Sequence, residues 1–375
     1  MKRGLLVLVW LGFFLSRVYI LFNPPPSYSD VFHDYRRYAQ MWSSGITPYF
    51  KHLYEYPPLT LPFLYLPQWL DLHGIGHYYE NYRLQIFFLD LLIFIIFLKT
   101  ILKSKTMPAV KYISLSFYLA APVIAKDFFY EGIDWVFISA FVMGIIYFSR
   151  RLIFWVLFWL STAIKLLTAP LALLFIKKDW RQMVLGFLLV WGLPLVIFRS
   201  SLGVIWVYNN QRGIKYAAFP SFVVETVNYF THTETRRNEP PDFELQGPVS
   251  RAAEKAIAVI WPLSVLLVLL YGWKIQHVTF AGRIKISLVY FLTTFFTAKI
   301  FSQPFHLWLI PLVSLYPFKS VKRQLLMMSL VLLLLIVDTT SWIRYPAAYK
   351  FSAYLFLRYL PMASLLWLSI KLPSR

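Results

Sequence analysis

The 375-residue sequence contains no cysteine, so disulfides, iron–sulfur clusters and thiolate zinc sites are excluded. It is also poor in charge, because Asp, Glu, Lys and Arg together make up 14% of the residues, whereas a soluble globular domain carries about 25%. Hydrophobic residues make up 59%. This composition excludes a soluble enzyme, a disordered chain and a fibrous repeat. We therefore predict an all-α polytopic membrane protein whose residues 1–375 form a single integral domain.

Several short motifs are absent as well. The sequence has no P-loop and no Gly-x-Gly-x-x-Gly fingerprint, which argues against the use of a nucleotide-linked substrate on the cytoplasmic side. Its histidines form no His-Glu-x-x-His pattern, and we expect neither a metal nor another cofactor. The absence of Asn-x-Ser/Thr acceptors favours a bacterial protein over an N-glycosylated luminal one.

Acidic residues are few, and the net charge is +20 from 37 Lys and Arg against 17 Asp and Glu. In a soluble protein this excess would suggest a nucleic-acid partner. Here the basic residues cluster between apolar runs, so membrane topology explains them and we predict no nucleic-acid binding. If the basic clusters face the cytoplasm, most carboxylates lie outside, in segments 23–83, 126–134 and 199–255. We expect a multi-pass protein of the bacterial plasma membrane with its functional site facing outward.

The apolar runs predict about ten to twelve transmembrane helices. Lys2 and Arg3 precede the first run, which we interpret as an uncleaved helix with a cytoplasmic N-terminus. Arg17 lies near its outer end, where its side chain can snorkel. The runs are 4–22, 84–102, 108–125, 133–149, 152–176, 182–198, 256–273, 285–301, 304–318, 324–341 and 351–370.

Two segments are too short for two full crossings. Residues 152–176 and 286–318 each carry a lysine, Lys165 or Lys299, near the middle beside proline and hydroxyl residues. We predict a hairpin of two short helices in each, because broken backbone at membrane depth marks binding sites in transporters. The alternative is two ordinary helices with irregular ends. For both lysines, the alternative to a functional role is an ion pair with Asp127, Glu131 or Asp134.

The first outer segment contains the strongest candidate for acid–base chemistry. Ser29 or Asp30 can begin a helix that runs to Ser44, and Gly45 can end it. On an α-helix, Asp30 and Asp34 would share one face. A carboxylate beside aromatic rings can accept a proton from a hydroxyl. The alternative is an N-cap carboxylate with a solvated neighbour.

A family resemblance enters with the motifs of this segment. They read Ser29-Asp30, Tyr35-x-x-Tyr38-Ala39, Gly45-x-x-Pro48-Tyr49 and Glu55-Tyr56-Pro57-Pro58-Leu59. The segment resembles the first outer loop of polyprenyl-phosphate-sugar-dependent glycosyltransferases with the GT-C fold, and most of all glycosyltransferase family 87, the bacterial mannosyltransferase-like group. Later stretches are similar to that family too: Asp134 at a helix start, Ala163-Ile164-Lys165-Leu166 with Pro170, Arg212-Gly213-Ile214 with Glu225-Thr226, and Lys299-Ile300-Phe301-Ser302-Gln303-Pro304 with Leu307-Trp308-Leu309-Ile310-Pro311.

The resemblance implies a GT-C-like bundle that transfers a sugar, with mannose as the family's usual one, from a polyprenyl-phosphate donor to a glycolipid or glycan acceptor. It implies inversion and a general base that matches Asp30 best, although Asp34 stands directly before Tyr35. Cations must stabilise the phosphate leaving group, and the candidates are Lys165, Lys299, Arg212, His306 and Arg358. Candidates for contacts with the sugar or the acceptor are Glu55, Tyr35, Tyr49, Asp134 and Gln303.

Several of these residues have a purely structural role as the alternative to a functional one. Arg358 can snorkel, His306 can be a capped core histidine, and Asp90 and Asp338 are expected to satisfy polar neighbours. Segment 199–255 is either a lid, with a short helix near 220–229, or a connector. For the whole chain the alternatives are a secondary transporter or flippase for a lipid-linked saccharide, and a non-catalytic assembly subunit.

Overall fold

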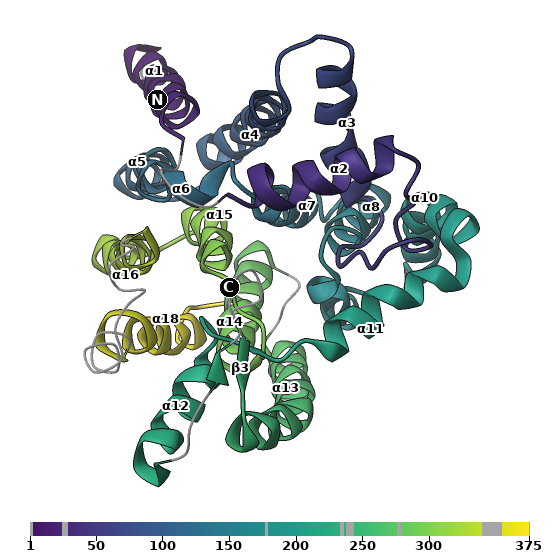
Figure 1. The fold of residues 1–375 in the computed structure, drawn as a ribbon. Helices are drawn as coiled ribbons and strands as arrows, with labels where there is room; N and C mark the ends of the chain where they lie inside the picture. Colours follow the sequence, from purple (N-terminus) through teal and green to yellow (C-terminus); the bar gives the residue numbers. More distant parts are fainter. Residues whose placement is uncertain are drawn as a thin grey trace. The chain divides into compact units, whose positions relative to one another are not determined.

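The computed structural model describes residues 3–24, 29–176, 179–232, 236–237, 244–275, 279–339 and 355–374. Within these ranges the chain is predominantly helical (Figure 1). Four of the described helices are long and apolar enough to cross a membrane, namely 4–22, 78–103, 180–211 and 248–274. The chain is therefore an all-α membrane protein apart from one small sheet. Lys2, Pro25 and Pro26, Lys177 and Lys178, Glu234, the segment 238–243 and Arg375 lie outside the described residues.

The chain divides into two compact units, and each is described by itself. Unit 1 comprises residues 1–210 and 317–321, and unit 2 comprises 211–316 and 322–375. Up to the boundary the elements are α1 (Arg3–Phe22), η1 (Val31–Tyr35), α2 (Arg36–Ser43), α3 (Thr60–Leu72), α4 (Tyr78–Lys103), α5 (Pro108–Ile124), α6 (Lys126–Phe129), α7 (Asp134–Ile146), α8 (Arg151–Thr162), η2 (Leu166–Leu171), α9 (Ala172–Phe175), α10 (Trp180–Phe198), η3 (Arg199–Leu202) and α11 (Gly203–Gln211).

The core of unit 1 is a layer of α7, α8 and α10, in which α8 packs against both neighbours. Helix α7 is buried almost throughout, whereas α10 buries one side only. Gly186 permits the close approach of α10 to α8, because a Cβ there would lie 2.8 Å from the Cβ of Trp155. Small residues at such contacts let apolar helices pack tightly within a membrane.

A second part of unit 1 joins α1, α4 and α5 through a buried ion pair. Arg17 is fully buried, and its Nε lies 2.8 Å from Asp90 Oδ2. Tyr118 and Tyr130 donate to the same carboxylate at 3.2 and 3.0 Å. The expectation that Arg17 snorkels is therefore wrong, because Asp90 gives its charge a partner inside the bundle. Asp90 satisfies polar neighbours, as expected.

The first predicted hairpin is confirmed. Helix α8 ends at Thr162, Lys165 is extended, and the chain returns through η2 and α9. The two ends of the hairpin meet, since Arg151 donates to the carbonyl of Phe175 at 2.8 Å and pairs with Asp179 at 2.5 Å.

Unit 2 repeats the hairpin design. Its elements are β1 (Ile214–Lys215), α12 (Phe219–Thr231), β2 (Arg236–Arg237), β3 (Glu244–Gln246), α13 (Pro248–Lys274), α14 (Phe280–Thr297), η4 (Gln303–Trp308), α15 (Leu309–Leu315), α16 (Val321–Thr339), η6 (Leu355–Tyr359) and α18 (Leu360–Ile370). Helix α14 ends two residues before Lys299, Ser302 is extended, and α15 packs back onto α14. The second predicted break is confirmed, but only the returning helix is short, because α14 has 18 residues and begins before the predicted segment.

Three features were not predicted. Helix α3 forms in the first outer segment despite Pro67 in its interior. Helix α11 and a small antiparallel sheet, ordered β1-β3-β2, form in segment 199–255, beside the expected helix α12. The strands of two or three residues are too short to produce a visible alternation of apolar and polar side chains.

Candidate active site

The part of the first outer segment from Ser29 to Gly45, which we call the acid segment, begins with a π turn instead of an α-helix. Residues 31–35 form η1 and α2 follows, ending near Gly45, whose φ of +83° suits glycine. A π turn is rare and often occurs at functional sites. The predicted α-helical register between Asp30 and Asp34 is therefore wrong, because the wider turn lies between them. Asp30 makes no side-chain capping bond to this helix.

Asp30 and Asp34 have different surroundings. Asp34 is 28% exposed and lies 3.4 Å from Arg37, which is 59% exposed. Half-buried Asp30 instead lies among tyrosines. Burial raises the pKa of Tyr35 well above its usual value, and the negative charges of Asp30 and Asp134 raise it further. The pKa of Tyr56 is raised in the same way by burial, by Glu55 and by Asp30. Asp30 thus lies within electrostatic range of Tyr35 and Tyr56, whereas Asp34, which is also half-buried, pairs with exposed Arg37 and lies within electrostatic range of Tyr38.

The Tyr35 hydroxyl connects the acid segment to the start of α7. It accepts a hydrogen bond from the backbone nitrogen of Ile133 at 3.3 Å and donates to Tyr56 at 3.4 Å. A Cβ at Gly132 would lie 3.9 Å from this hydroxyl and 3.6 Å from Asp134 Oδ2. The acid segment and the start of α7 therefore meet at one point.

Asp134 connects the start of α7 to the first hairpin. Lys165 Nζ donates to Asp134 Oδ1 at 2.7 Å, and the two side chains are 17% and 9% exposed. Of the three predicted alternative partners of Lys165, Asp134 is the one it contacts here. The pair lies at the break of the first hairpin, where the backbone of Lys165 is extended. A cation and a carboxylate are therefore in contact at a partly buried position.

Glu131 holds this arrangement in place and was not predicted as a site residue. Ser29, directly before Asp30, donates to one oxygen of Glu131, and Tyr79 donates to the other at 2.7 Å. Arg83 lies 3.0 Å from the same carboxylate. Arg83 also donates to the carbonyls of Leu21 and Ile20 at 2.9 and 2.6 Å. One buried carboxylate thereby ties the acid segment to α4 and to the end of α1.

Tyr49 and Glu55 belong to a stretch of the first outer segment that is rich in aromatic residues. Tyr49 has a φ of +66° and donates to the carbonyl of Tyr56 at 2.5 Å. Its ring is buried and contacts Phe198. Burial together with the charges of Glu55 and Asp34 raises the pKa of Tyr38 to about 12. Tyr49 thus fixes the loop backbone, and Glu55 lies within electrostatic range of Tyr38 and Tyr56.

Unit 2 contains a separate basic cluster. Lys299 Nζ donates to the carbonyl of Arg212 at 2.5 Å, and the backbone of Lys215 bonds to that of Lys299 at 2.9 Å. Lys215 Nζ donates to Ser302 at 3.1 Å, while Arg212 pairs with Glu244 at 3.3 Å. Three cations therefore gather at the second hairpin break. Lys215 was not predicted, because its contact with the break depends on strand β1.

His306 and Arg358 share a buried carboxylate. Both contact Asp338, and all three side chains are at most 2% exposed. His306 is a core histidine with a hydrogen-bond partner, and Arg358 does not snorkel. Asp338 satisfies polar neighbours, as expected. Gln303 begins η4, directly after the break.

Comparisons with protein-family models and with curated proteins find no match for this chain. Among the described residues, no group of three or more His, Asp or Glu side chains is placed to hold a metal ion.

Proposed function

We propose that the chain is an integral membrane glycosyltransferase, similar to the GT-C enzymes of family 87, that uses a polyprenyl-phosphate-linked sugar. The observation that carries the proposal is the placement of Asp30. It is a half-buried carboxylate directly before a π turn, and the Tyr35 hydroxyl of that turn accepts a hydrogen bond from the backbone of Ile133, the residue before Asp134, which pairs with Lys165. The donor, a glycolipid or glycan acceptor and the bilayer are its proposed partners, with mannose as the sugar.

The reaction requires one proton transfer and one leaving group. The acceptor hydroxyl oxygen attacks the anomeric carbon, the bond from that carbon to the phosphate oxygen breaks, and polyprenyl phosphate leaves with the bonding electrons. Asp30 takes the proton of the attacking hydroxyl. One displacement inverts the anomeric centre and needs no second carboxylate as nucleophile.

Cations stabilise the charge that develops on the phosphate. In unit 1 this role falls to Lys165, whose ammonium Asp134 holds at the hairpin break. The basic cluster of unit 2, formed by Lys299, Arg212 and Lys215, is an alternative binding place for a phosphate group, in which Arg212 also pairs with Glu244. His306 and Arg358 are engaged by Asp338, so we assign them to the support of the second hairpin.

The proposed location is the bacterial plasma membrane, with the acid segment facing outward. The support for this orientation is the distribution of charges, since basic clusters and carboxylates alternate between successive apolar runs. Impermeant labelling of engineered cysteines, described below, tests the orientation independently of any activity.

A transporter or flippase for a lipid-linked saccharide is the second candidate. It is favoured by the two broken hairpins, because discontinuous helices at membrane depth form the substrate sites of many transporters. Both candidates require a lipid-linked sugar, so substrate binding alone does not separate them.

The deciding experiment compares Asp30→Asn with Asp34→Asn in purified protein supplied with radiolabelled polyprenyl-phosphate mannose. We expect Asp30→Asn to lower transfer by about 10²–10⁴-fold, the usual contribution of a general base. Asp34→Asn is the matched control in the same helix and is expected to keep most activity. Full transfer by the Asp30→Asn and the double variant contradicts the assignment. Movement of the lipid-linked sugar across liposomes without transfer favours the flippase.

A further inference from the structure

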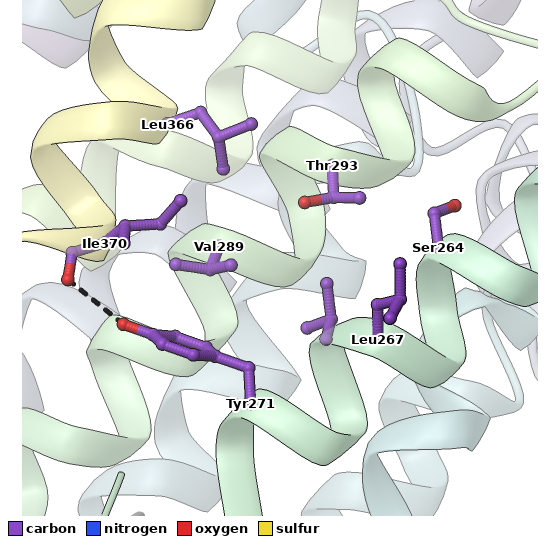
Figure 2. A pocket seen from close by; sticks show the side chains of 8 residues that line it. Ser264, Leu267, Tyr271, Val289, Thr293, Leu366 and Ile370 are labelled. Carbon is purple, nitrogen blue, oxygen red and sulfur yellow. Dashed lines mark hydrogen bonds between the residues drawn. The ribbon is translucent and has the colours of Figure 1, made fainter. Parts of the chain in front are cut away.

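Unit 2 has an apolar groove whose lining residues differ from those of its basic cluster. Helices α13, α14 and α18 enclose a volume of about 230 Å³ that is open on one side (Figure 2). Val268 and Val289 form its buried floor, and Leu267 on the rim is 65% exposed. Tyr271 lies across one end, where its hydroxyl donates to the carbonyl of Ile370 at 3.0 Å (Figure 2). Leu366 and Ile370 of α18 form one wall of the groove (Figure 2).

The groove runs along a membrane-spanning helix. Helix α13 is apolar over a length that can cross a bilayer. Two exposed tryptophans lie close in sequence to the residues at the Tyr271 end of the groove. Trp273 belongs to the last turn of α13, and Trp367 belongs to α18. Exposed tryptophans of this kind mark the boundary between membrane and water. The Tyr271 end therefore lies at the interface, and the Thr293 end points toward the hydrocarbon core.

Cations surround the interfacial end. Lys274 follows Tyr271 by less than one turn, and Lys371 directly follows Ile370; both are exposed. Lys285 is already engaged, because its Nζ donates to the carbonyl of Leu372 at 2.6 Å and lies 5.5 Å from the Tyr271 ring. Lys371 Nζ lies 5.9 Å from the ring of Trp367 on its own helix and is still exposed. An apolar groove with two exposed ammonium groups at its end complements a molecule with a hydrocarbon chain and an anionic head.

We propose that this groove binds one acyl chain of an anionic phospholipid, with the lipid phosphate held by Lys274 and Lys371. Lys274 and Lys371 belong to basic clusters of the side predicted to be cytoplasmic, where anionic lipids are abundant in many membranes. The lipid is neither donor nor acceptor, so this inference does not rest on the proposed transferase activity.

The test uses the purified full chain, stripped of lipid by washing in detergent and titrated with dioleoyl-phosphatidylglycerol or dioleoyl-phosphatidylcholine. Native mass spectrometry then counts the bound lipids. We expect tighter binding of phosphatidylglycerol, and a loss on the order of tenfold in that affinity for Lys274→Gln/Lys371→Gln. The matched control is Lys99→Gln/Lys103→Gln, which removes the same charge from exposed positions near the end of α4 in unit 1.

Blocking the groove provides the second arm. Thr293→Phe and, separately, Leu366→Trp are expected to weaken the binding of phosphatidylglycerol, since either side chain fills space that a lipid chain would take. Using two blocking variants keeps the test open if one of them fails to fold. The proposal is overturned if both lipids bind equally, if the control variant loses as much affinity as Lys274→Gln/Lys371→Gln, or if a folded blocking variant binds as well as the parent.

Discussion

The carboxylates of unit 1 differ mainly in the partners that surround them. Asp90 faces Arg17, Asp134 faces Lys165 and Glu131 faces Arg83, so each has a cation within 3.0 Å. Buried charges are stable only when paired in this way. Asp30 is less buried than these three acids, and its negative charge raises the pKa of both Tyr35 and Tyr56. Because a partly exposed carboxylate can be reached by an acceptor hydroxyl, we propose Asp30, and not the more deeply buried acids, as the base.

The buried pair of Arg17 and Asp90 leads to a stability prediction. Arg17→Met leaves Asp90 charged and unpaired, and the expected cost is about 3–5 kcal/mol. The double variant Arg17→Met/Asp90→Leu removes both charges and should recover much of this loss. Thermal unfolding in detergent measures both variants. A double variant less stable than the single one would show that the tyrosine bonds to Asp90, and not its charge, dominate.

Glu131 leads to a second prediction at this scale. Glu131→Gln removes the charge that faces Arg83 and weakens the contact with Ser29, so we expect both a lower unfolding temperature and lower sugar transfer. Glu80→Gln on exposed α4 surface is the control and should change neither. Unchanged melting and transfer in Glu131→Gln would mean that the acid segment is positioned by other contacts.

Among the elements, the two hairpins share one construction. In each, an α-helix stops, a short non-helical stretch with extended residues follows, and a 3₁₀ turn containing proline leads into a short returning helix. Proline removes a backbone donor and favours such breaks. At the first break Lys165 donates to Asp134, and at the second Lys299 donates to the carbonyl of Arg212. The construction therefore places a lysine at each break, held by a partner from another part of the chain.

The hairpin of unit 1 allows a structural role of Lys165 to be separated from a functional one. Lys165→Met leaves Asp134 without its cation, so we expect a loss of both stability and transfer. Lys165→Met/Asp134→Leu removes the unpaired charge and should restore the unfolding temperature without restoring transfer. Recovery of transfer by the double variant would assign the lysine a structural role alone.

Packing between α8 and α10 provides another prediction. A Cβ at Gly186 would lie 2.8 Å from Trp155 Cβ and 3.1 Å from the Val156 nitrogen, so backbone must move. Gly186→Ala is expected to destabilise the protein by about 1–3 kcal/mol. Gly192→Ala in the same helix meets nothing within 4 Å and is the control. Equal unfolding temperatures of the two variants would contradict the close helix contact.

At the scale of the whole molecule, the charge distribution predicts a single orientation. Exposed His73 and His232 belong to the predicted outer segments, whereas exposed Lys105 and Lys319 belong to predicted cytoplasmic loops. The native chain has no cysteine, so one engineered thiol reports on one position without background.

In intact cells, an impermeant maleimide should label cysteine at positions 73 and 232 but not at 105 and 319. After permeabilisation all four should react, which controls for accessibility. Labelling at 105 or 319 in intact cells would contradict the orientation and with it the outward-facing acid segment.

The sequence was sufficient for features that depend on neighbouring residues. The long apolar helices, the two lysine-bearing breaks and the end of α2 at Gly45 were predicted close to where they occur, because hydrophobic length, proline and glycine act over a few residues. The π turn at Val31–Tyr35 was not predicted, since its residues have no local signature that separates it from an α-helix.

Tertiary structure alone decided which charges are partners. Arg17 and Asp90 are 73 residues apart, and Ser29 and Glu131 are 102 apart, so no local pattern joins them. The choice between Asp30 and Asp34 as the base stays a proposal, which the comparison of the two Asn variants tests. Spacing along the chain identifies which groups carry charge, but the energy of a charge depends on burial and on the distance to its partner, and only the packed helices set those.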